Sequence, residues 1–192
     1  MKLQHHASII RPAQLTDADA IAKVQVDSWR TTYKGIMSDD SLAALSYDQH
    51  AKMWHKILSD AGPNKFAYVA EEEHGKLVGF ALGGPERNGD PDYCGELYAI
   101  YLYEPYQRRG IGRSLMRLIA QNLLDAGLGS LLVWVLEANP CRSFYEALGG
   151  ERLRDKRINV GGVQLVEVAY GWRDARILVN RNDSHHEKIR SK

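Results

Sequence analysis

The sequence predicts an α/β domain with a mixed sheet that is mostly antiparallel and contains one parallel βαβ unit. Two apolar runs, over residues 97–102 and 131–136, flank an amphipathic helix expected over residues 110–126, which is the pattern of parallel strands joined by a crossover helix. Two further pairs of strand-like runs are joined by short glycine-containing turns, which indicates antiparallel hairpins. Both kinds of strand connection are therefore expected in one sheet.

The first third of the chain is expected to hold a short strand and two helices. Residues 8–11 form the strand, and Thr16 with the acidic residues after it begins the first helix. Residues 38–40 are expected to be a polar break before a second helix over residues 47–58. One stripe of the first helix is apolar or aromatic and contains Ala18, Ala22, Val26, Trp29 and Tyr33.

The rest of the chain alternates strands, loops and helices. Residues 65–72 and 76–83 predict the first hairpin, and residues 84–92 predict a surface loop that either folds over a site or is simply solvated. The central strand begins near Tyr93, and its apolar run predicts burial on both faces. A short helix over residues 140–148 precedes the second hairpin, formed by residues 152–160 and 163–172.

Composition and charge limit the possible environments and partners. Lysine and arginine number 25 against 24 acidic residues, so the net charge of +1 favours neither a nucleic acid nor an anionic membrane as partner. No stretch approaches a membrane span, and two distant cysteines indicate a reducing compartment, so a cytoplasmic protein is expected. Residues 1–173 read as a single domain and residues 174–192 as a polar C-terminal tail, in which residues 177–179 are a possible small anchor.

The turn between the central strand and the crossover helix has the features of an anion site. It reads Gln-Arg-Arg-Gly-Ile-Gly from Gln107 to Gly112 and opens a helix, whose first N–H groups have no intrahelical partner. Arg113 and Ser114 follow, so the Lys-Ser/Thr pair of a nucleoside triphosphate loop is absent, as is the third glycine of a dinucleotide loop. A phosphate ligand of another class is therefore favoured.

This turn resembles the Gln/Arg-x-x-Gly-x-Gly/Ala loop of the GNAT superfamily of acetyl-CoA-dependent N-acyltransferases. A second resemblance follows in order: Asn139 closes the second apolar run, and Phe144 and Tyr145 lie on the next helix. The resemblance covers roughly residues 8–172 and implies a GNAT-like fold, in which the central strands splay to admit acetyl-CoA. It departs from the family pattern at Arg109, where many members carry a small residue, and at Gly150, where the motif usually has phenylalanine.

The resemblance also implies where acetyl-CoA and the acceptor bind. Trp29 and Tyr33, at the end of the first helix, are expected to wall the acceptor site, although core packing explains them equally well. Asn139 is expected to begin its helix as an N-cap and to contact the cofactor's arm. The other expected cofactor contacts are the main chain of Ile100, Tyr101, Leu102 and Tyr103, the loop residues Gln107, Arg108, Arg109, Gly110, Ile111, Gly112, Arg113 and Ser114, and Tyr145.

Two residues are the candidates for proton transfer. Tyr145 is the expected acid for the leaving thiolate, since a phenol's pKa lies near that of a thiol. Glu96, at the start of an otherwise apolar run, should have a raised pKa or a hydrogen-bonded partner and could take the amine proton through water. The hydroxyls of Tyr98 and Tyr101 are possible relays on opposite faces of the strand, with Tyr101 nearer the acceptor only if a bulge reorients it.

The expected reaction is direct attack by a primary amine on acetyl-CoA in a ternary complex. The amine belongs to a small molecule or a peptide, and the protein acts as a monomer or homodimer. An acyl-cysteine route through Cys141 lacks a recognisable histidine partner, and no metal site is expected, since the paired histidines at residues 5–6 and 185–186 lie in terminal segments. The alternative function is a non-catalytic acyl-CoA-binding or sensor domain.

Overall fold

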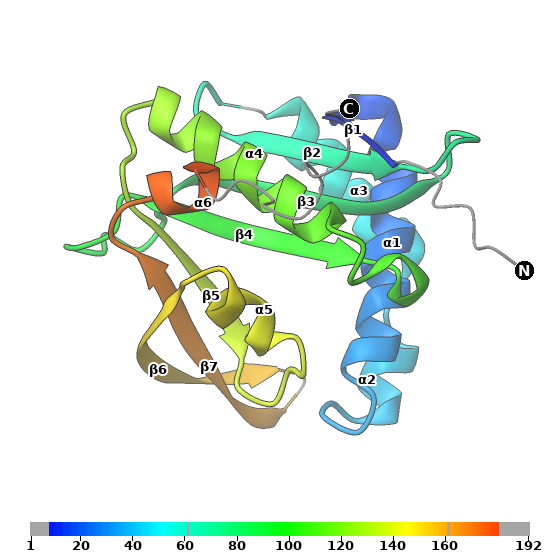
Figure 1. Cartoon of the computed structure of the whole chain (residues 1–192). Coiled ribbons are helices and arrows are strands. Elements are labelled where there is room, and N and C mark those ends of the chain that lie inside the picture. Colours follow the sequence, from blue (N-terminus) through cyan, green and yellow to red (C-terminus); the bar gives the residue numbers. More distant parts are fainter. Residues whose placement is uncertain (1–7, 61, 161, 181–192) are drawn as a thin grey trace, which may run out of the picture.

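Seven strands form one mixed sheet with helices on both faces (Figure 1). The computed structural model describes residues 8–60, 62–160 and 162–180. The strand order is β1-β2-β3-β4-β5-β7-β6, and within it only β4 and β5 are parallel. This confirms the predicted mixed sheet with one βαβ unit. The strands are β1 (Ile9–Pro12), β2 (Phe66–Glu71), β3 (Leu77–Pro85), β4 (Gly95–Leu102), β5 (Leu131–Leu136), β6 (Glu151–Val160) and β7 (Val163–Trp172).

The two long N-terminal helices and the crossover helix cover opposite faces of the sheet (Figure 1). Helices α1 (Ala18–Thr32) and α3 (Tyr47–Ser59) pack together on one face, where the buried Trp54 Nε1 donates to Gln25 Oε1 at 2.6 Å. Helix α4 (Ile111–Asp125) buries Leu115, Ile119 and Leu123 against the other face. The shorter elements are α2 (Asp39–Ala43), α5 (Arg142–Ala147), α6 (Arg176–Asn180) and the 3-10 turns η1 (Leu15–Asp17) and η2 (Glu104–Tyr106).

Several element boundaries differ from those expected from the sequence. Helix α1 begins at Ala18, because Thr16 lies within η1. The expected polar break at residues 38–40 is wrong, since Ser38 Oγ accepts the Ser41 N–H at 3.2 Å and caps α2. Strand β3 continues to Pro85 and β4 begins only at Gly95, so the loop between them has the predicted length but lies two residues later in the chain. Local caps and strand pairing, which periodicity does not report, set these limits.

Strand β4 leaves its parallel partner after three residue pairs. Residues 95–97 pair with residues 131–133 of β5, and no pairing follows, although both strands continue. The expectation that residues 97–102 are buried on both faces is therefore wrong beyond Leu97, since the residues after it are only partly buried. The two strands diverge and leave an opening at the carboxyl end of β4, which is the splay that the resemblance implied.

A β-bulge in β4 changes which side chains share a face. Leu82 of β3 pairs with Ala99 and Gly83 pairs with Leu97, so Tyr98 is left without a partner. Leu97 packs in the core under α4, whereas Tyr101 contacts Phe80 and Trp29 on the α1 face. In a regular strand Leu97 and Tyr101 would share a face. The bulge thus turns Tyr101 toward α1. From the sequence, Tyr101 was expected to lie nearer the acceptor only if such a bulge reoriented it.

The C-terminal segment folds back as far as it is described. Arg176–Asn180 form α6, which packs against α4 and buries Leu178, whereas Ile177 stays exposed. Residues 177–179, the possible small anchor of the tail, therefore lie within this helix. Residues 181–192 lie outside the described part of the chain. Among the described helices, none combines the length and the apolar character that a membrane crossing requires.

Candidate active site

The loop before α4 is shaped to present backbone N–H groups. Arg108 has φ 57° and Gly110 has φ 84°, so two left-handed residues alternate with others in the turn. Such alternation turns successive N–H groups inward and forms a concave anion site. The first bond of α4 runs from Ser114 N–H to Gly110 O at 3.0 Å, so the N–H groups of Ile111 and Gly112 precede the helical ladder. The loop that was predicted to bind the pyrophosphate therefore has a concave backbone in front of α4.

The end of β4 supplies main-chain groups beside this loop. Tyr103 N–H donates to Val78 O of β3 at 2.9 Å, whereas Leu102 O accepts from Gln107 Nε2 at 3.2 Å. Backbone groups of successive strand residues point to alternate sides, so those of Ile100 and Leu102 point away from β3 and into the opening. A Cβ on Gly112 would lie 3.4 Å from both Leu102 and Phe144, so strand, loop and α5 meet here.

Tyr145 lies on α5 at the other side of the opening. Its ring stacks on Tyr170 with centroids 5.9 Å apart and meets Phe144 edge-on at 5.3 Å. It is 7% exposed, and burial raises the pKa of its hydroxyl, with smaller contributions from Tyr33 and Cys141. Tyr145 therefore stays protonated throughout the physiological pH range and holds a proton that it can donate.

The residues predicted to wall the acceptor site meet the second motif. Tyr33 closes α1 and is buried, and Asn139 Nδ2 donates to its hydroxyl at 3.5 Å. The Trp29 ring meets Tyr33 edge-on at 5.3 Å and lies 6.4 Å from Tyr101. Burial raises the pKa of both Tyr33 and Tyr101, while neighbouring polar groups oppose part of the rise at Tyr33. Trp29, Tyr33, Tyr101 and Asn139 thus form one cluster.

Asn139 caps its turn in a different way from the one predicted. Its Oδ1 accepts the Cys141 N–H at 2.8 Å, but α5 itself begins only at Arg142. Asn139 is therefore not the N-cap of that helix. Burial raises the pKa of the Cys141 thiol, which makes a thiolate less available and weakens the acyl-cysteine route.

Glu96 lies in a separate pocket on the α1 face of the sheet. A Cβ on Gly95 would meet Leu123 of α4, so the next side chain, Glu96, points to the opposite face. We call this cavity, with a volume of about 330 Å³, the Glu96 pocket. Its lining residues come from the β3–β4 loop and from β4, β5, β6 and β7, and they are Arg87, Asn88, Glu96, Tyr98, Trp134, Lys156 and Glu167.

Arg87 holds the Glu96 carboxylate from the loop. Its Nε donates to Glu96 Oε2 at 2.9 Å, its Nη2 donates to Oε1, and its guanidinium stacks 4.2 Å above the Tyr98 ring centroid. Glu96 is 1% exposed, so the sequence was right to expect a partner for a carboxylate in this strand. The loop is fixed by its own acids, since Glu86 accepts the Asn88 and Asp90 N–H groups. Arg87 and Asn88 of this loop line the Glu96 pocket, which is compatible with the first of its two predicted alternatives.

A second ion pair lines the same pocket and was missed from the sequence. Lys156 Nζ lies 3.2 Å from Glu167 Oε2 and 3.9 Å from the centroid of the Trp134 ring. The signal was present in the second hairpin, because pairing outward from Val160 and Val163 brings Lys156 opposite Glu167. Arg87, by contrast, lies in an irregular loop, where no periodicity connects it to Glu96.

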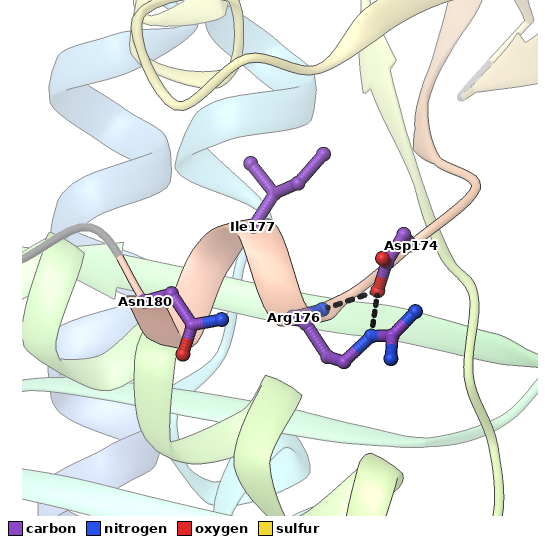
Figure 2. A pocket seen from close by; sticks show the side chains of 4 residues that line it. All are labelled: Asp174, Arg176, Ile177 and Asn180. Carbon is purple, nitrogen blue, oxygen red and sulfur yellow. Dashed lines mark hydrogen bonds and ion pairs between the residues drawn. The ribbon is translucent and has the colours of Figure 1, made fainter.

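Another depression lies at α6 and carries no comparable chemistry. It is lined by Asp174, Arg176, Ile177 and Asn180, and Arg176 Nε donates to Asp174 Oδ1 at 2.8 Å (Figure 2). Because α6 packs on α4, this depression is on the face of the sheet opposite Glu96. The described residues hold no group of three or more His, Cys, Asp or Glu side chains able to bind a metal ion. The terminal histidine pairs lie outside those residues.

Comparisons with known proteins agree on one family. The sequence profile of the acetyltransferase (GNAT) family matches residues 25–149. The uncharacterized N-acetyltransferase YuaI of Bacillus subtilis (strain 168) is 45% identical over 175 residues, covering 90% of this chain and 98% of the relative.

Solved structures share the fold at lower identity. The PaiA N-acetyltransferase of Thermoplasma acidophilum, in complex with coenzyme A, has a TM-score of 0.61 and 19% identity, over 84% of this chain and 98% of that one. The yncA protein of Salmonella typhimurium, with its cofactor acetyl-CoA, has a TM-score of 0.64 and 18% identity, over 86% and 93% of the two chains. At such identities the likeness is one of fold.

Proposed function

Because the chain belongs to the GNAT family of acetyltransferases and is therefore an acyltransferase, we propose that it moves an acetyl group from acetyl-CoA to a primary amine of a small molecule or peptide. The amine attacks the bound thioester directly, in a ternary complex. Family membership also favours an enzyme over the alternative of a non-catalytic acyl-CoA sensor.

The observation that carries this proposal is the early separation of β4 from β5 beside the N-terminus of α4. Beyond residue 97, β4 has no pairing with β5, so the N–H groups of Ile100 and Leu102 on that side take part in no strand ladder. The turn at residues 108–112 offers further N–H groups beside them. A ligand with an anionic head and an amide-containing arm is complementary to both parts, since the N–H groups bind the anion and the strand edge pairs with the amides. Acetyl-CoA has this construction.

Tyr145 is the proposed acid in this reaction. It lies on α5 near the opening, and its phenol remains protonated because burial raises its pKa. When the C–S bond of the tetrahedral adduct breaks, the departing thiolate takes the phenolic proton. The high pKa of Tyr145 means that the proton is then readily recovered from solvent or from the nitrogen of the adduct.

Glu96 is the proposed base, acting through water. The Arg87 side chain donates one hydrogen bond to each oxygen of the Glu96 carboxylate. The same bonds occupy both carboxylate oxygens, so the proton passes through a water in the Glu96 pocket. Of the two relay candidates, Tyr98 lines this pocket and its hydroxyl donates to Pro85 O. Tyr101, which the bulge brings to the same face, lies with Trp29 and Phe80.

A panel screen tests the proposal. Thiol release from acetyl-CoA is followed with amino acids, alkylamines, diamines and peptides, and acetyl-CoA binding is measured separately by calorimetry. We expect binding by the protein alone and turnover with at least one class of amine. Tight acetyl-CoA binding without turnover on any amine would support the sensor instead, and absence of binding would reject both functions.

A further inference from the structure

Every charged side chain of the Glu96 pocket is already paired with another from the same pocket. Arg87 binds Glu96, and Lys156 lies 3.2 Å from Glu167. The pocket thus carries two positive and two negative groups, and one of the negative groups is Glu96, the proposed base. The Glu96 and Glu167 carboxylates are less exposed than their cationic partners, so a ligand that displaces a cation from either carboxylate must bring another cation in its place.

The Lys156 ammonium marks a position suited to a primary ammonium ion. It lies 3.9 Å from the Trp134 ring centroid and beside the Glu167 carboxylate, so an aromatic face and an anion act on one cation. The Lys156 side chain is 42% exposed and long, and it can swing aside without disturbing the strand. An amine substrate that enters beside Trp134 takes this place and displaces Lys156 from Glu167.

We infer that the acceptor of this enzyme is a zwitterionic amine that carries a carboxylate, as an amino acid does. Its ammonium binds Trp134 and Glu167, while the displaced Lys156 binds its carboxylate, so each charge keeps a partner. Arg87, whose side chain is 57% exposed, and Asn88 add donors to the same pocket. An alkylamine has no carboxylate and would leave the displaced Lys156 ammonium unpaired. A diamine would bring a second cation into a pocket whose two carboxylates are already paired with cations.

This inference rests on the proposed function and uses the same chemical step. The ammonium nitrogen loses two protons, one before attack and one from the adduct. A C–N bond forms as the C–S bond breaks, one proton returns to the thiolate through Tyr145, and the other leaves for solvent. The inference adds only the group that the acceptor carries besides its amine, which is a carboxylate.

Three matched series of substrates test the inference. Each contains chains of two to six carbons with a primary amine at one end, and the other end is a carboxylate, a methyl group or a second amine. With kcat/KM measured from thiol release, we expect the best carboxylate-bearing amine to exceed its alkylamine and diamine counterparts by at least about tenfold. Equal or faster turnover of the alkylamine or diamine series overturns the substrate class but leaves the proposed acetyl transfer intact.

A pair of variants on β6 assigns the effect to Lys156. Lys156→Met should lower the ratio of kcat/KM for the carboxylate-bearing amine to that for its alkylamine by about tenfold or more, mainly through KM. Arg157→Met is the matched control, because Arg157 is the next residue on the strand and faces the other side. A merely structural effect of Lys156→Met would change both substrates alike, and an unchanged ratio would overturn the inference. If all three series fail with the wild type, the inference is rejected, and failure of every other amine as well rejects the proposed function.

Discussion

Gly110 tests the assignment of the cofactor loop, because its left-handed backbone admits few other residues. Its φ of 84° disfavours most side chains, but asparagine and aspartate both tolerate this conformation and have the same shape. Gly110→Asp should weaken acetyl-CoA binding far more than Gly110→Asn, because only the carboxylate repels the pyrophosphate. Calorimetry on the two folded variants makes the comparison, and equal affinities would reject the loop as the phosphate site.

Tyr145 is the residue at which packing and catalysis can be separated. Tyr145→Phe keeps the ring that stacks on Tyr170 and removes only the hydroxyl. We expect unchanged acetyl-CoA affinity and a kcat lower by about 10²–10⁴-fold, the usual range for general acid catalysis. Steady-state kinetics with the best amine measures the loss. A change within about twofold while chemistry is rate-limiting would leave Tyr145 as a packing residue.

Glu96 should control the pH dependence of the amine's activation. If a proton leaves through Glu96, kcat/KM rises with pH, and Glu96→Gln should weaken that rise while preserving acetyl-CoA binding. The same amine must be used throughout, because its own ionisation also produces a rise. Glu137→Gln is the control, since Glu137 is a partly exposed glutamate paired with Arg152 outside the Glu96 pocket. Superimposable pH profiles of Glu96→Gln and the wild type would discard Glu96 as the base.

Among the elements, the junction of β1 and α1 depends on one buried acid. Arg11 donates to both oxygens of Asp17, at 2.7 and 2.9 Å, and this holds the pKa of Asp17 below its ordinary value. The unfolded chain therefore binds the proton at higher pH than the folded one. The stabilisation from Asp17 is complete above about pH 4, the ordinary pKa of an aspartate, and is lost as the pH falls through the lowered pKa.

Asp17→Asn should accordingly destabilise the protein by about 1–3 kcal/mol at pH 7, where the wild type has its charged carboxylate. The difference should shrink as the pH falls from about 4 through the lowered pKa of Asp17, because the unfolded wild type then binds a proton more readily than the folded one. Urea unfolding at pH 7 and pH 3 measures it. A constant difference at both pH values would show that the charge of Asp17 does not contribute.

Hydrophobic periodicity predicts those elements whose pattern of apolar residues repeats within one short stretch of the chain. β5 and β7 have the bounds expected, and α3 and α4 differ from expectation by a residue at the ends, because apolar stripes and glycine stops define them. The bulge at Tyr98 was left open, since it depends on how β3 pairs with β4. Motif residues of the site, such as Gly110 and Tyr145, could be named in advance. Arg87 could not, because it reaches Glu96 from a loop.

At the scale of the molecule, the opening between β4 and β5 should be visible in amide exchange. The N–H groups of Ile100 and Leu102 point into the opening, whereas Tyr103 N–H is bonded to Val78 O. We expect residue-resolved hydrogen exchange by NMR to be fast at Ile100 and Leu102, slow at Tyr103, and slowed at the first two by acetyl-CoA. At about 100 times its Kd, a ligand also stabilises the folded chain by about 2.7 kcal/mol. Unchanged exchange at Ile100 and Leu102 in the complex would contradict the proposed binding site of the cofactor's arm.

The short pairing between β4 and β5 also makes the sheet mechanically uneven. Every residue of β4 except Tyr98 is paired with β3, and all of β5 is paired with β7, but only residues 95–97 join the two halves in the plane of the sheet. Under a pulling force applied across the strands, this short joint carries the load with the fewest backbone bonds. The halves should part there first. In the proposed complex, acetyl-CoA bridges the opening and joins the two halves, so the rupture force should rise with cofactor occupancy.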